Sequence, residues 1–366
     1  MPASRTYIFA GGGTGGHLFP GVAVAEQLRD LDPSARILFV GSDKPLELSI
    51  FNRLQLEHRS LPVESLQSLT RHPIRFVARN WKAWRIARQW IRELQPAVVV
   101  GLGGYASAPI VWAASRVRIP VALLEQNVIP GRTTRLLSGE SKLVCTSFAE
   151  ATRHLPHGTS IEVTGNPVRQ EIARLHQARP VRQGKELLIL GGSQGADRLN
   201  DAVIGAVSAL RNDLVEWHIV HQSGLRQIES LRTAYRELQL KATVEPFFDD
   251  MQIRYQSASV VISRAGATTL AELTCCGLPM ILVPFPQAAD DHQRANAIAL
   301  RDHQAAVVVE HQPAAADTVK LLTDQLATLV ARPDMSQSLS DAAYRIAKPD
   351  AAAVVAQRIR SFAGSE

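Results

Sequence analysis

A short apolar run followed directly by a glycine-rich loop and a helical pattern occurs twice in this chain. The first copy runs from Tyr7–Ala10 through Gly11–His17 into a helical pattern at Pro20–Leu31, with Pro20 expected in the first turn. The second runs from Glu186–Leu190 into the letters GGSQGADRLN. A strand that ends in a glycine loop and a helix is the opening unit of a doubly wound sheet. The repeat therefore predicts two such sheets.

Further apolar runs, separated by helical stretches, follow each copy, which is typical of parallel sheets. In the first half we expect strands at Arg36–Val40, Ala97–Gly101, Val121–Leu124, Leu143–Thr146 and Ile161–Val163. In the second half we expect them at Trp217–Val220, Ala242–Val244, Val260–Ser263, Met280–Pro284 and Ala306–Val309. The predicted fold class is α/β, with two Rossmann-like, doubly wound domains at residues 1–165 and 166–346, joined near Gly165–Lys185. The last helical pattern, Asp350–Phe362 within residues 347–366, is expected to pack back on the first domain.

Composition agrees with a globular chain of this size. A length of 366 residues fits two or three domains, and 46% hydrophobic with 20% charged residues excludes a disordered or fibrous class. No apolar run approaches the roughly 20 residues of a membrane span, and the N-terminus leads straight into a strand, so we expect no signal peptide. Three cysteines (Cys145, Cys275 and Cys276) lack metal-ligand spacing. We therefore expect a reducing cytoplasm, with no structural disulfide or zinc.

The positive charge is concentrated in one segment. The formal net charge is +6, and residues 65–95 contain seven cations against one acid, Glu93, which accounts for the whole excess. Tryptophans alternate with the cations of Arg71–Arg92, and on a helical wheel the cations cover about half the circumference. This pattern favours an interfacial helix on an anionic membrane. In the alternative, the tryptophans face the domain core and the arginines face water. We expect no nucleic acid as partner, since no nucleic-acid module accompanies the segment.

The first glycine loop permits a second interpretation. Its letters GGGTGG fit the G-x-G-x-x-G pattern of dinucleotide sites, and Asp43 follows the second strand as such sites require. A dehydrogenase therefore stays open on this loop alone. Against it, the loop ends in His17, and a second phosphate-type loop exists in the other half. The glycines can also serve only to permit tight turns, and for Gly101, Gly103 and Gly104 that reading is as good as a functional one.

Polar residues stand at the carboxyl ends of two predicted strands of the first half. A histidine with a pKa near neutrality can take a proton from a hydroxyl nucleophile, and His17 lies at the carboxyl edge of the first strand, where open sheets bind ligands. Glu125, Gln126 and Asn127 follow the Val121–Leu124 strand at the same predicted edge. Asn127 either contacts a ligand there or caps the following turn.

The stretch Ile262–Ala297 predicts a nucleotide-sugar site. Gly266 allows close backbone approach, and Ala267, Thr268 and Thr269 open a helix whose N–H groups suit a phosphate. Glu272, further along this helix, is placed to accept bonds from sugar hydroxyls. A polar loop then leads to Gln293, which either binds a sugar or completes a capping box with Asp290. No paired-carboxylate DxD motif stands at a loop, so we predict no metal site.

Several motifs together resemble the MurG family of glycosyltransferases: GGGTGGHLFPG, GGYASAP, EQN, TGNPVR, GGSQGA, FFDDM, SRAGATTLAE and DHQRANA, in order from Tyr7 to Ala306. The resemblance implies a GT-B architecture with an interdomain cleft. It implies inverting, metal-independent transfer of GlcNAc from UDP-GlcNAc, without a cofactor. The implied acceptor is the 4-hydroxyl of MurNAc-pentapeptide on undecaprenyl diphosphate (lipid I). The implied location is peripheral, on the cytoplasmic face of the inner membrane, whose anionic surface is a further expected partner through Arg71–Arg92.

The resemblance also implies site residues. Those on the first domain are Thr14, Gly15 and Gly16 near the reacting centre, His17 as the leading candidate for general base or for acceptor positioning, and Asn127 beside the GlcNAc. Those expected on the diphosphate and uracil are Arg169, Ser193 and Phe248. The phosphate-and-ribose helix start comprises Ala267, Thr268, Thr269, Leu270, Ala271 and Glu272, and Gln293 binds the GlcNAc hydroxyls. Leu124 stands where many of these enzymes have a histidine, which strengthens His17 or Glu125 as catalytic candidates.

Three alternatives remain open from the sequence. The same fold serves other UDP-sugar glycolipid transferases and UDP-GlcNAc 2-epimerases. A non-catalytic nucleotide-sugar-binding scaffold would keep the fold without turnover.

Overall fold

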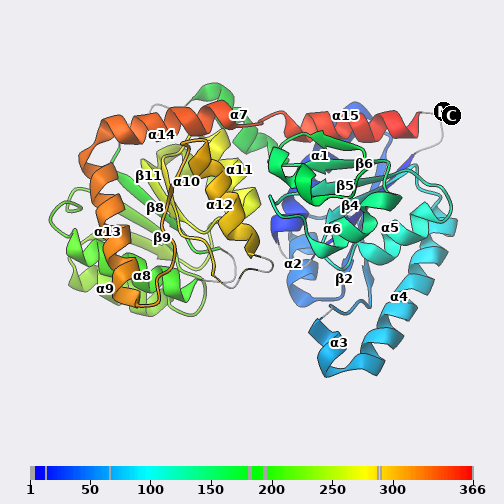
Figure 1. Cartoon of the computed structure of the whole chain (residues 1–366), viewed down its shortest axis with the longest axis horizontal. Helices are drawn as coiled ribbons and strands as arrows, with labels where there is room; N and C mark the ends of the chain where they lie inside the picture. Colours follow the sequence, from blue (N-terminus) through cyan, green and yellow to red (C-terminus); the bar gives the residue numbers. More distant parts are fainter. Residues whose placement is uncertain are drawn as a thin grey trace. The chain divides into compact units, whose positions relative to one another are not determined.

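The structure, a computed structural model, describes residues 5–12, 15–65, 67–179, 184–192, 196–286, 288 and 291–364 (Figure 1). The chain divides into two compact units. The first comprises residues 1–169 and 350–366, and the second comprises residues 170–349.

The first unit is built on a seven-stranded sheet of order β3-β2-β1-β4-β5-β6-β7, in which all paired strands are parallel. Its strands are β1 (Thr6–Gly11), β2 (Arg36–Ser42), β3 (His58–Leu61), β4 (Val98–Gly103), β5 (Val121–Glu125), β6 (Leu143–Thr146) and β7 (Ile161–Val163). The order reverses between β1 and β4. The carboxyl ends of these two strands therefore form the switch point at which open α/β sheets bind ligands.

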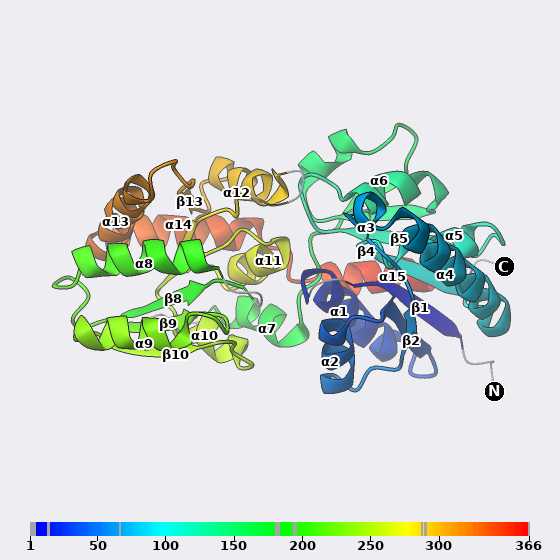
Figure 2. The same ribbon diagram turned by 90° about the horizontal axis from the view of Figure 1, so that it is seen from below.

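Helices cover both faces of this sheet (Figure 2). One face packs against α1 (Gly15–Leu31), α2 (Pro45–Arg53) and α15 (Ala351–Ala363). The other packs against α4 (Pro73–Leu94), α5 (Ala108–Ser115) and α6 (Arg132–Leu137). The short helices α3 (Gln67–Arg71), η1 (Ser138–Glu140) and η2 (Ala149–His154) complete the unit. Because the sheet is covered on both faces, its central strands are apolar along their whole length.

The start of α1 differs from the predicted one. The helix begins at Gly15, so Pro20 lies inside it and not in its first turn. A proline at this position cannot donate to the carbonyl four residues earlier, which is why the sequence suggested a start at Pro20. The earlier start has a functional consequence, because it places His17 in the first turn of the helix.

The second unit repeats the plan with six parallel strands in the order β10-β9-β8-β11-β12-β13. The strands are β8 (Glu186–Leu190), β9 (His218–Gln222), β10 (Lys241–Glu245), β11 (Val260–Ser263), β12 (Met280–Leu282) and β13 (Val307–Val308). The order reverses between β8 and β11, which gives this unit its own switch point. The prediction of two doubly wound parallel sheets is confirmed.

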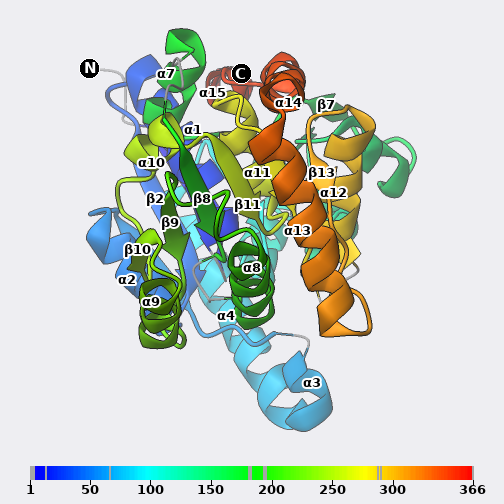
Figure 3. The ribbon, with the colours of Figure 1, turned by 90° about the vertical axis from the view of Figure 1, so that its left-hand side faces the viewer.

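The helices of the second unit are α7 (Gln170–Ala178), α8 (Asp197–Ala209), α9 (Ile228–Glu237), α10 (Met251–Ser257), α11 (Ala267–Cys275), α12 (His292–Asp302), α13 (Ala315–Ala331) and α14 (Pro333–Ile346). Helices α8 and α13 pack side by side over one core cluster (Figure 3). Across both units, no helix of the described ranges has the length and apolarity that a bilayer crossing requires.

Candidate active site

His17 lies at the switch point of the first unit, in the first turn of α1. Its Nδ1 atom is 2.9 Å from Oε1 of Gln126, a buried residue directly after β5. The Gln126 Nε2 group donates to the carbonyls of Leu102 and Leu124, at 3.2 Å and 3.3 Å. Gln126 therefore connects the ends of β4 and β5 to the helix that carries the histidine.

These bonds determine the tautomer of His17. Because the Gln126 amide nitrogen donates to two carbonyls, its Oε1 faces the imidazole and accepts a hydrogen bond. The proton of neutral His17 is consequently on Nδ1, and the lone pair is on Nε2. A histidine held in this way can accept a proton through Nε2. Sequence analysis placed Gln126 at this edge but gave it no role.

Glycines bring the end of β4 close to the first loop. Gly103 and Gly104 have positive φ values of 91° and 72°, and a Cβ at Gly104 would lie 2.5 Å from the carbonyl oxygen of Gly12. A side chain at residue 104 would therefore separate the two strand ends. For these two glycines the structure favours a conformational requirement at the switch point.

Glu125 has a different environment from His17. Its carboxylate is buried and accepts bonds from the backbone N–H of Asn127 and of Gly131, both at 3.0 Å, and from the Asn127 amide at 3.3 Å. Both carboxylate oxygens are thus engaged by the loop after β5. The arrangement fixes the Asn127 side chain and suits a positioning role for Glu125.

A buried carboxylate also faces the first glycine loop. Glu47 of α2 accepts bonds from the Ser42 N–H and hydroxyl, at 2.8 Å and 2.6 Å. A Cβ at Gly12 would overlap a Glu47 carboxylate oxygen, so this acid occupies the space beside the loop. Asp43, the acid that suggested a dinucleotide site, pairs with Arg79 of α4 at 2.6 Å. The Glu47 carboxylate beside Gly12 would therefore repel the pyrophosphate of a dinucleotide bound at this loop.

At the switch point of the second unit, α11 begins directly after Gly266, whose φ and ψ are −69° and 129°. Glycine has no side chain that could accept from the N–H groups of Ala267, Thr268 and Thr269. These groups and the positive end of the helix dipole form the kind of site that binds phosphate. The structure thus places the predicted phosphate helix at the predicted strand end.

Glu272 lies in the second turn of α11 and is only 7% exposed. One of its oxygens, Oε2, accepts a bond of 2.8 Å from the hydroxyl of Tyr255, a buried residue of α10. Tyr255 therefore fixes the direction of the carboxylate. The sequence indicated Glu272 but not this partner, because the two residues come from different helices.

Phe248 precedes α10, and its ring is buried. The guanidinium of Arg254 lies over the ring, 4.8 Å from its centroid, and also pairs with Asp250 at 2.7 Å. These contacts fix the loop backbone at residue 248, where a contact to uracil is predicted.

Gln293 lies in the first turn of α12, and the residue before this helix, Asp291, has a positive φ of 54° and makes no side-chain capping bond. Its Oε1 accepts a bond of 3.0 Å from the Phe285 N–H, in the loop after β12. Asp290, the other member of the predicted capping box, lies outside the described residues. Asn296, on the same helix, is fully buried and donates to the Ala265 carbonyl at 3.2 Å.

Of the other predicted site residues, Gly15 and Gly16 begin α1. Arg169 is part-buried, and its guanidinium lies 5.6 Å from the ring centroid of Phe19 in the same unit. Leu270 and Ala271 belong to the helix α11 described above. Thr14 and Ser193 lie outside the described residues.

Sequence analysis missed Arg264 and His311. Arg264 follows β11 directly, is 8% exposed, and its Nη1 is 2.7 Å from Nε2 of His311. Burial lowers the pKa of Arg264 to about 10. The available signal was positional, since each residue is a basic side chain within three positions of a strand end.

The basic segment is divided between core and solvent. Ala83, Ala87 and Ile91 of α4 are buried. Ile74 is 85% exposed, Val77 62% and Trp81 60%, and their spacing places them on one helix face. The exposed cations Lys82 and Arg85 follow on the same helix. The alternative in which all the tryptophans face the core is therefore wrong for Trp81.

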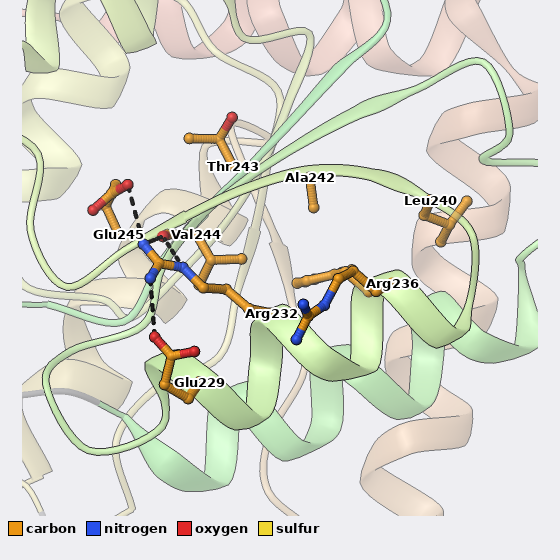
Figure 4. A pocket seen from close by; sticks show the side chains of 9 residues that line it. Glu229, Arg232, Arg236, Leu240, Ala242, Thr243, Val244 and Glu245 are labelled. Carbon is orange, nitrogen blue, oxygen red and sulfur yellow. Dashed lines mark hydrogen bonds and ion pairs between the residues drawn. The ribbon is translucent and has the colours of Figure 1, made fainter.

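A pocket of about 400 Å³ lies between α9 and the edge strand β10 (Figure 4). Arg232 extends along its wall and donates to the Val244 carbonyl at 2.9 Å, to Glu229 at 3.0 Å and to Glu245 at 3.4 Å (Figure 4). The charges of Arg232 and its two acids are already paired in this way. We assign the pocket no part in the chemistry.

Comparison with known proteins gives a consistent result. Residues 7–146 match the glycosyltransferase family 28 N-terminal domain, and residues 186–355 match the glycosyltransferase family 28 C-terminal domain. A relative from Anaeromyxobacter dehalogenans is 39% identical over 353 residues, covering 95% of this chain and 90% of its own length. It is named UDP-N-acetylglucosamine--N-acetylmuramyl-(pentapeptide) pyrophosphoryl-undecaprenol N-acetylglucosamine transferase. A relative of the same name from Geotalea uraniireducens is 37% identical, covering 95% of this chain and 96% of its own length.

Solved structures agree with the sequence relatives. The crystal structure of Acinetobacter baumannii MurG has a TM-score of 0.75 at 30% identity and covers 98% of this chain and 99% of its own. UDP-GlcNAc 2-epimerase from Neisseria meningitidis, solved with UDP-GlcNAc, has a TM-score of 0.67 at 12% identity and covers 98% of this chain and all of its own. The second match shows a shared fold alone.

Proposed function

The chain belongs to the MurG family within glycosyltransferase family 28, and from this premise we propose that it transfers GlcNAc from UDP-GlcNAc to lipid I in peptidoglycan synthesis. It is a GT-B glycosyltransferase that depends on UDP-GlcNAc. The residue-level proposal rests on one observation, which is that the switch points of the two units carry different chemical groups. The first has a histidine with its lone pair on Nε2, and the second has a helix that begins directly after a glycine, together with a buried carboxylate.

In this proposal the two units divide the substrates. The second unit binds the nucleotide, with the diphosphate at the start of α11 (Ala267–Leu270), the ribose on Glu272 and uracil at the Phe248 backbone. The first unit binds the lipid-borne acceptor.

The proposed chemistry is an inverting displacement. As the acceptor 4-hydroxyl oxygen attacks the anomeric carbon, His17 Nε2 takes the hydroxyl proton, and the bond to the UDP oxygen breaks with its electron pair on the diphosphate. The proposal assigns Thr14, Gly15 and Gly16 contacts to the donor near the reacting centre. Asn127 contacts the GlcNAc, and Glu125 holds Asn127 in place.

The departing diphosphate needs positive charge and hydrogen-bond donors. The N–H groups that begin α11 supply donors, and Arg169 and Ser193 complete the proposed set. Gln293 contacts the GlcNAc hydroxyls. This set consists of protein groups alone, so the proposed mechanism is metal-independent.

Incubation with UDP-GlcNAc and a lipid I analogue tests the activity. The proposal expects one UDP released for each β-linked disaccharide formed, with unchanged rates after chelation of divalent ions. Formation of UDP-ManNAc would show an epimerase, and nucleotide binding without turnover would show a scaffold. A disaccharide with another sugar donor would show a different glycolipid transferase.

Replacing Glu272 with glutamine should weaken UDP binding by about 10- to 100-fold, since a hydrogen bond to a charged group contributes about 1.5–3 kcal/mol. Tyr255→Phe, which frees the direction of the carboxylate, should cause a smaller loss. Isothermal calorimetry with UDP measures both. Glu237→Gln, at an exposed position of α9, is the matched control. Unchanged affinity in Glu272→Gln would refute the ribose assignment.

We place the protein at the cytoplasmic face of the inner membrane as a peripheral enzyme, docked by α4. Ile74, Val77 and Trp81 form an apolar face that the unit leaves exposed, and Lys82 and Arg85 lie close enough to meet anionic headgroups. Arg79 is less available, because it pairs with Asp43 and Glu64, at 2.6 Å and 3.2 Å. A lipid-linked acceptor requires such docking.

Changing Ile74, Val77 and Trp81 together to serine should lower binding to vesicles containing anionic lipid by at least about tenfold, because each buried apolar side chain contributes about 1.5–3 kcal/mol. Cosedimentation measures the bound fraction. Val215, Leu225 and Leu321, exposed apolar residues of the other unit, provide a matched triple-serine control. Equal binding by the α4 variant and the parent would reject this face.

A further inference from the structure

Arg264 connects three strand ends of the second unit. It follows β11, and its Nη1 donates to the carbonyls of Val283 and Pro284 after β12, at 2.9 Å and 3.1 Å. The same nitrogen is 2.7 Å from Nε2 of His311, which follows β13. The guanidinium also lies 5.6 Å from the ring centroid of Phe285. The side chain therefore runs along the carboxyl edge of the sheet.

His311 has a defined chemical state in this arrangement. An arginine can only donate, so the Nε2 of His311 is an acceptor that shares the two Nη1 hydrogens with the Val283 and Pro284 carbonyls. The ring is then neutral, with its proton on Nδ1. Burial and the nearby charge of Arg264 lower the pKa of His311 to about 4, which agrees with this state. His311 thus provides a fixed acceptor for a buried cation.

The contacts form a closed circuit around Gln293. Phe285, next to the carbonyl of Pro284 that Arg264 holds, donates its N–H to the Gln293 side chain. Arg294, the next residue along, pairs with Glu310 at 3.0 Å, and Glu310 is followed directly by His311. The circuit returns to Arg264 through the His311 ring. Gln293 is therefore braced from two directions, through its own side chain and through its neighbour in the helix.

We propose that Arg264 and His311 are a positioning pair that sets the place of Gln293, and thereby controls recognition of the sugar but not of the nucleotide. This inference rests on the proposed function, in which Gln293 contacts the GlcNAc hydroxyls. The uridine contacts come instead from Glu272 and Phe248, which lie outside the circuit and have their own partners, Tyr255 and Arg254. Breaking one contact of the circuit should therefore weaken binding of the GlcNAc moiety without weakening binding of the uridine moiety.

The test measures binding of UDP and of UDP-GlcNAc by the full chain. His311→Leu removes the acceptor and should raise the KM and Kd for UDP-GlcNAc by about tenfold, with the Kd for UDP changed less than twofold. His311→Gln retains an acceptor oxygen and should restore most of the UDP-GlcNAc affinity. The ¹⁵N spectrum of the parent at neutral pH should show the His311 Nε2 as the unprotonated nitrogen.

Glu310→Ala opens the circuit at an exposed ion pair and provides a second variant if His311→Leu folds poorly. Its effect should have the same direction and be smaller. The control is His218→Leu at the opposite, amino-terminal edge of the sheet, where His218 contacts Thr243 at 2.9 Å. It should leave the ratio of the two affinities unchanged.

Parallel losses of UDP and UDP-GlcNAc affinity in His311→Leu, unchanged affinities in both His311→Leu and Glu310→Ala, or a His311→Gln variant no better than His311→Leu would overturn the proposal. A parent protein that binds neither compound would instead refute the proposed function. The two failures are therefore distinguishable.

Discussion

Replacing His17 with glutamine lowers kcat by about 10²- to 10⁴-fold in the expected result, while the Kd for UDP stays within about twofold of the parent value. Glutamine keeps the size of the side chain and its ability to bond to Gln126, but it cannot take the proton of the acceptor hydroxyl. The loss is confined to the chemical step because proton transfer develops in the transition state. Single-turnover kinetics with saturating UDP-GlcNAc measure it.

Gln126→Leu provides a graded comparison. It leaves the imidazole in place but removes the group that keeps the proton on Nδ1 and connects the ends of β4 and β5. We expect a smaller loss in kcat than for His17→Gln, and the double variant should be no slower than His17→Gln alone, because both changes act on one proton acceptor. A His17→Gln enzyme that turns over at the parent rate would remove His17 from the chemistry.

Removal of α15 should abolish folding of the first unit. Val355, Ala356 and Ile359 of this helix are completely buried in the core cluster that also contains Tyr7, Phe9 and the inner face of α1. Apolar surface of this extent contributes about 5 kcal/mol or more, which is comparable with the whole stability of a domain. A chain ending at Pro349 should therefore lose the unfolding transition of the first unit in calorimetry, while the second unit keeps its own.

Point changes in α15 make this expectation quantitative. Ile359→Ala should lower the free energy of unfolding of the first unit by about 2–5 kcal/mol, the range for large-to-small changes in a core. Gln357→Ala, on the exposed face of the same helix, should have almost no effect. A chain lacking α15 that retains both transitions would show that the helix is dispensable for the core.

Strands buried on both faces were the most predictable elements. β6, β8 and β11 have the bounds that their apolar runs suggested. The edge strand β7 was also predicted with its observed bounds, because its first and last residues are apolar. β3 was missed, because HRSL carries three polar residues, and its place at the edge of the sheet depends on pairing with β2. Sequence patterns indicate strands through their apolar residues, and the mostly polar β3 gives no such signal.

Within the site, the sequence could indicate strand ends but not the partners that meet there. His17 and Gln126 are 109 residues apart, and Arg264 and His311 are 47 apart. The His17–Gln126 contact depends on strand order, because the reversal at the first switch point places β1 beside β4, next to β5. Arg264 and His311 follow β11 and β13, which lie on either side of β12. Glu125 shows the same limit, because the sequence indicates its place at a strand end but not its hydrogen-bond partners. The sequence indicated it as a second catalytic candidate beside His17, the leading one, and its hydrogen bonds to Asn127 and Gly131 became visible only in the loop geometry.

The position of α15 also bears on how the protein is made. Its residues are translated after about 180 residues of the second unit, so a ribosome working at about 5–20 residues per second needs roughly 10–40 s to reach them. During that interval the nascent first unit exposes the apolar surface that α15 will cover. Chaperones that bind nascent chains therefore have time to bind this surface. Biogenesis therefore ends with the amino-terminal half, which begins synthesis first and matures last.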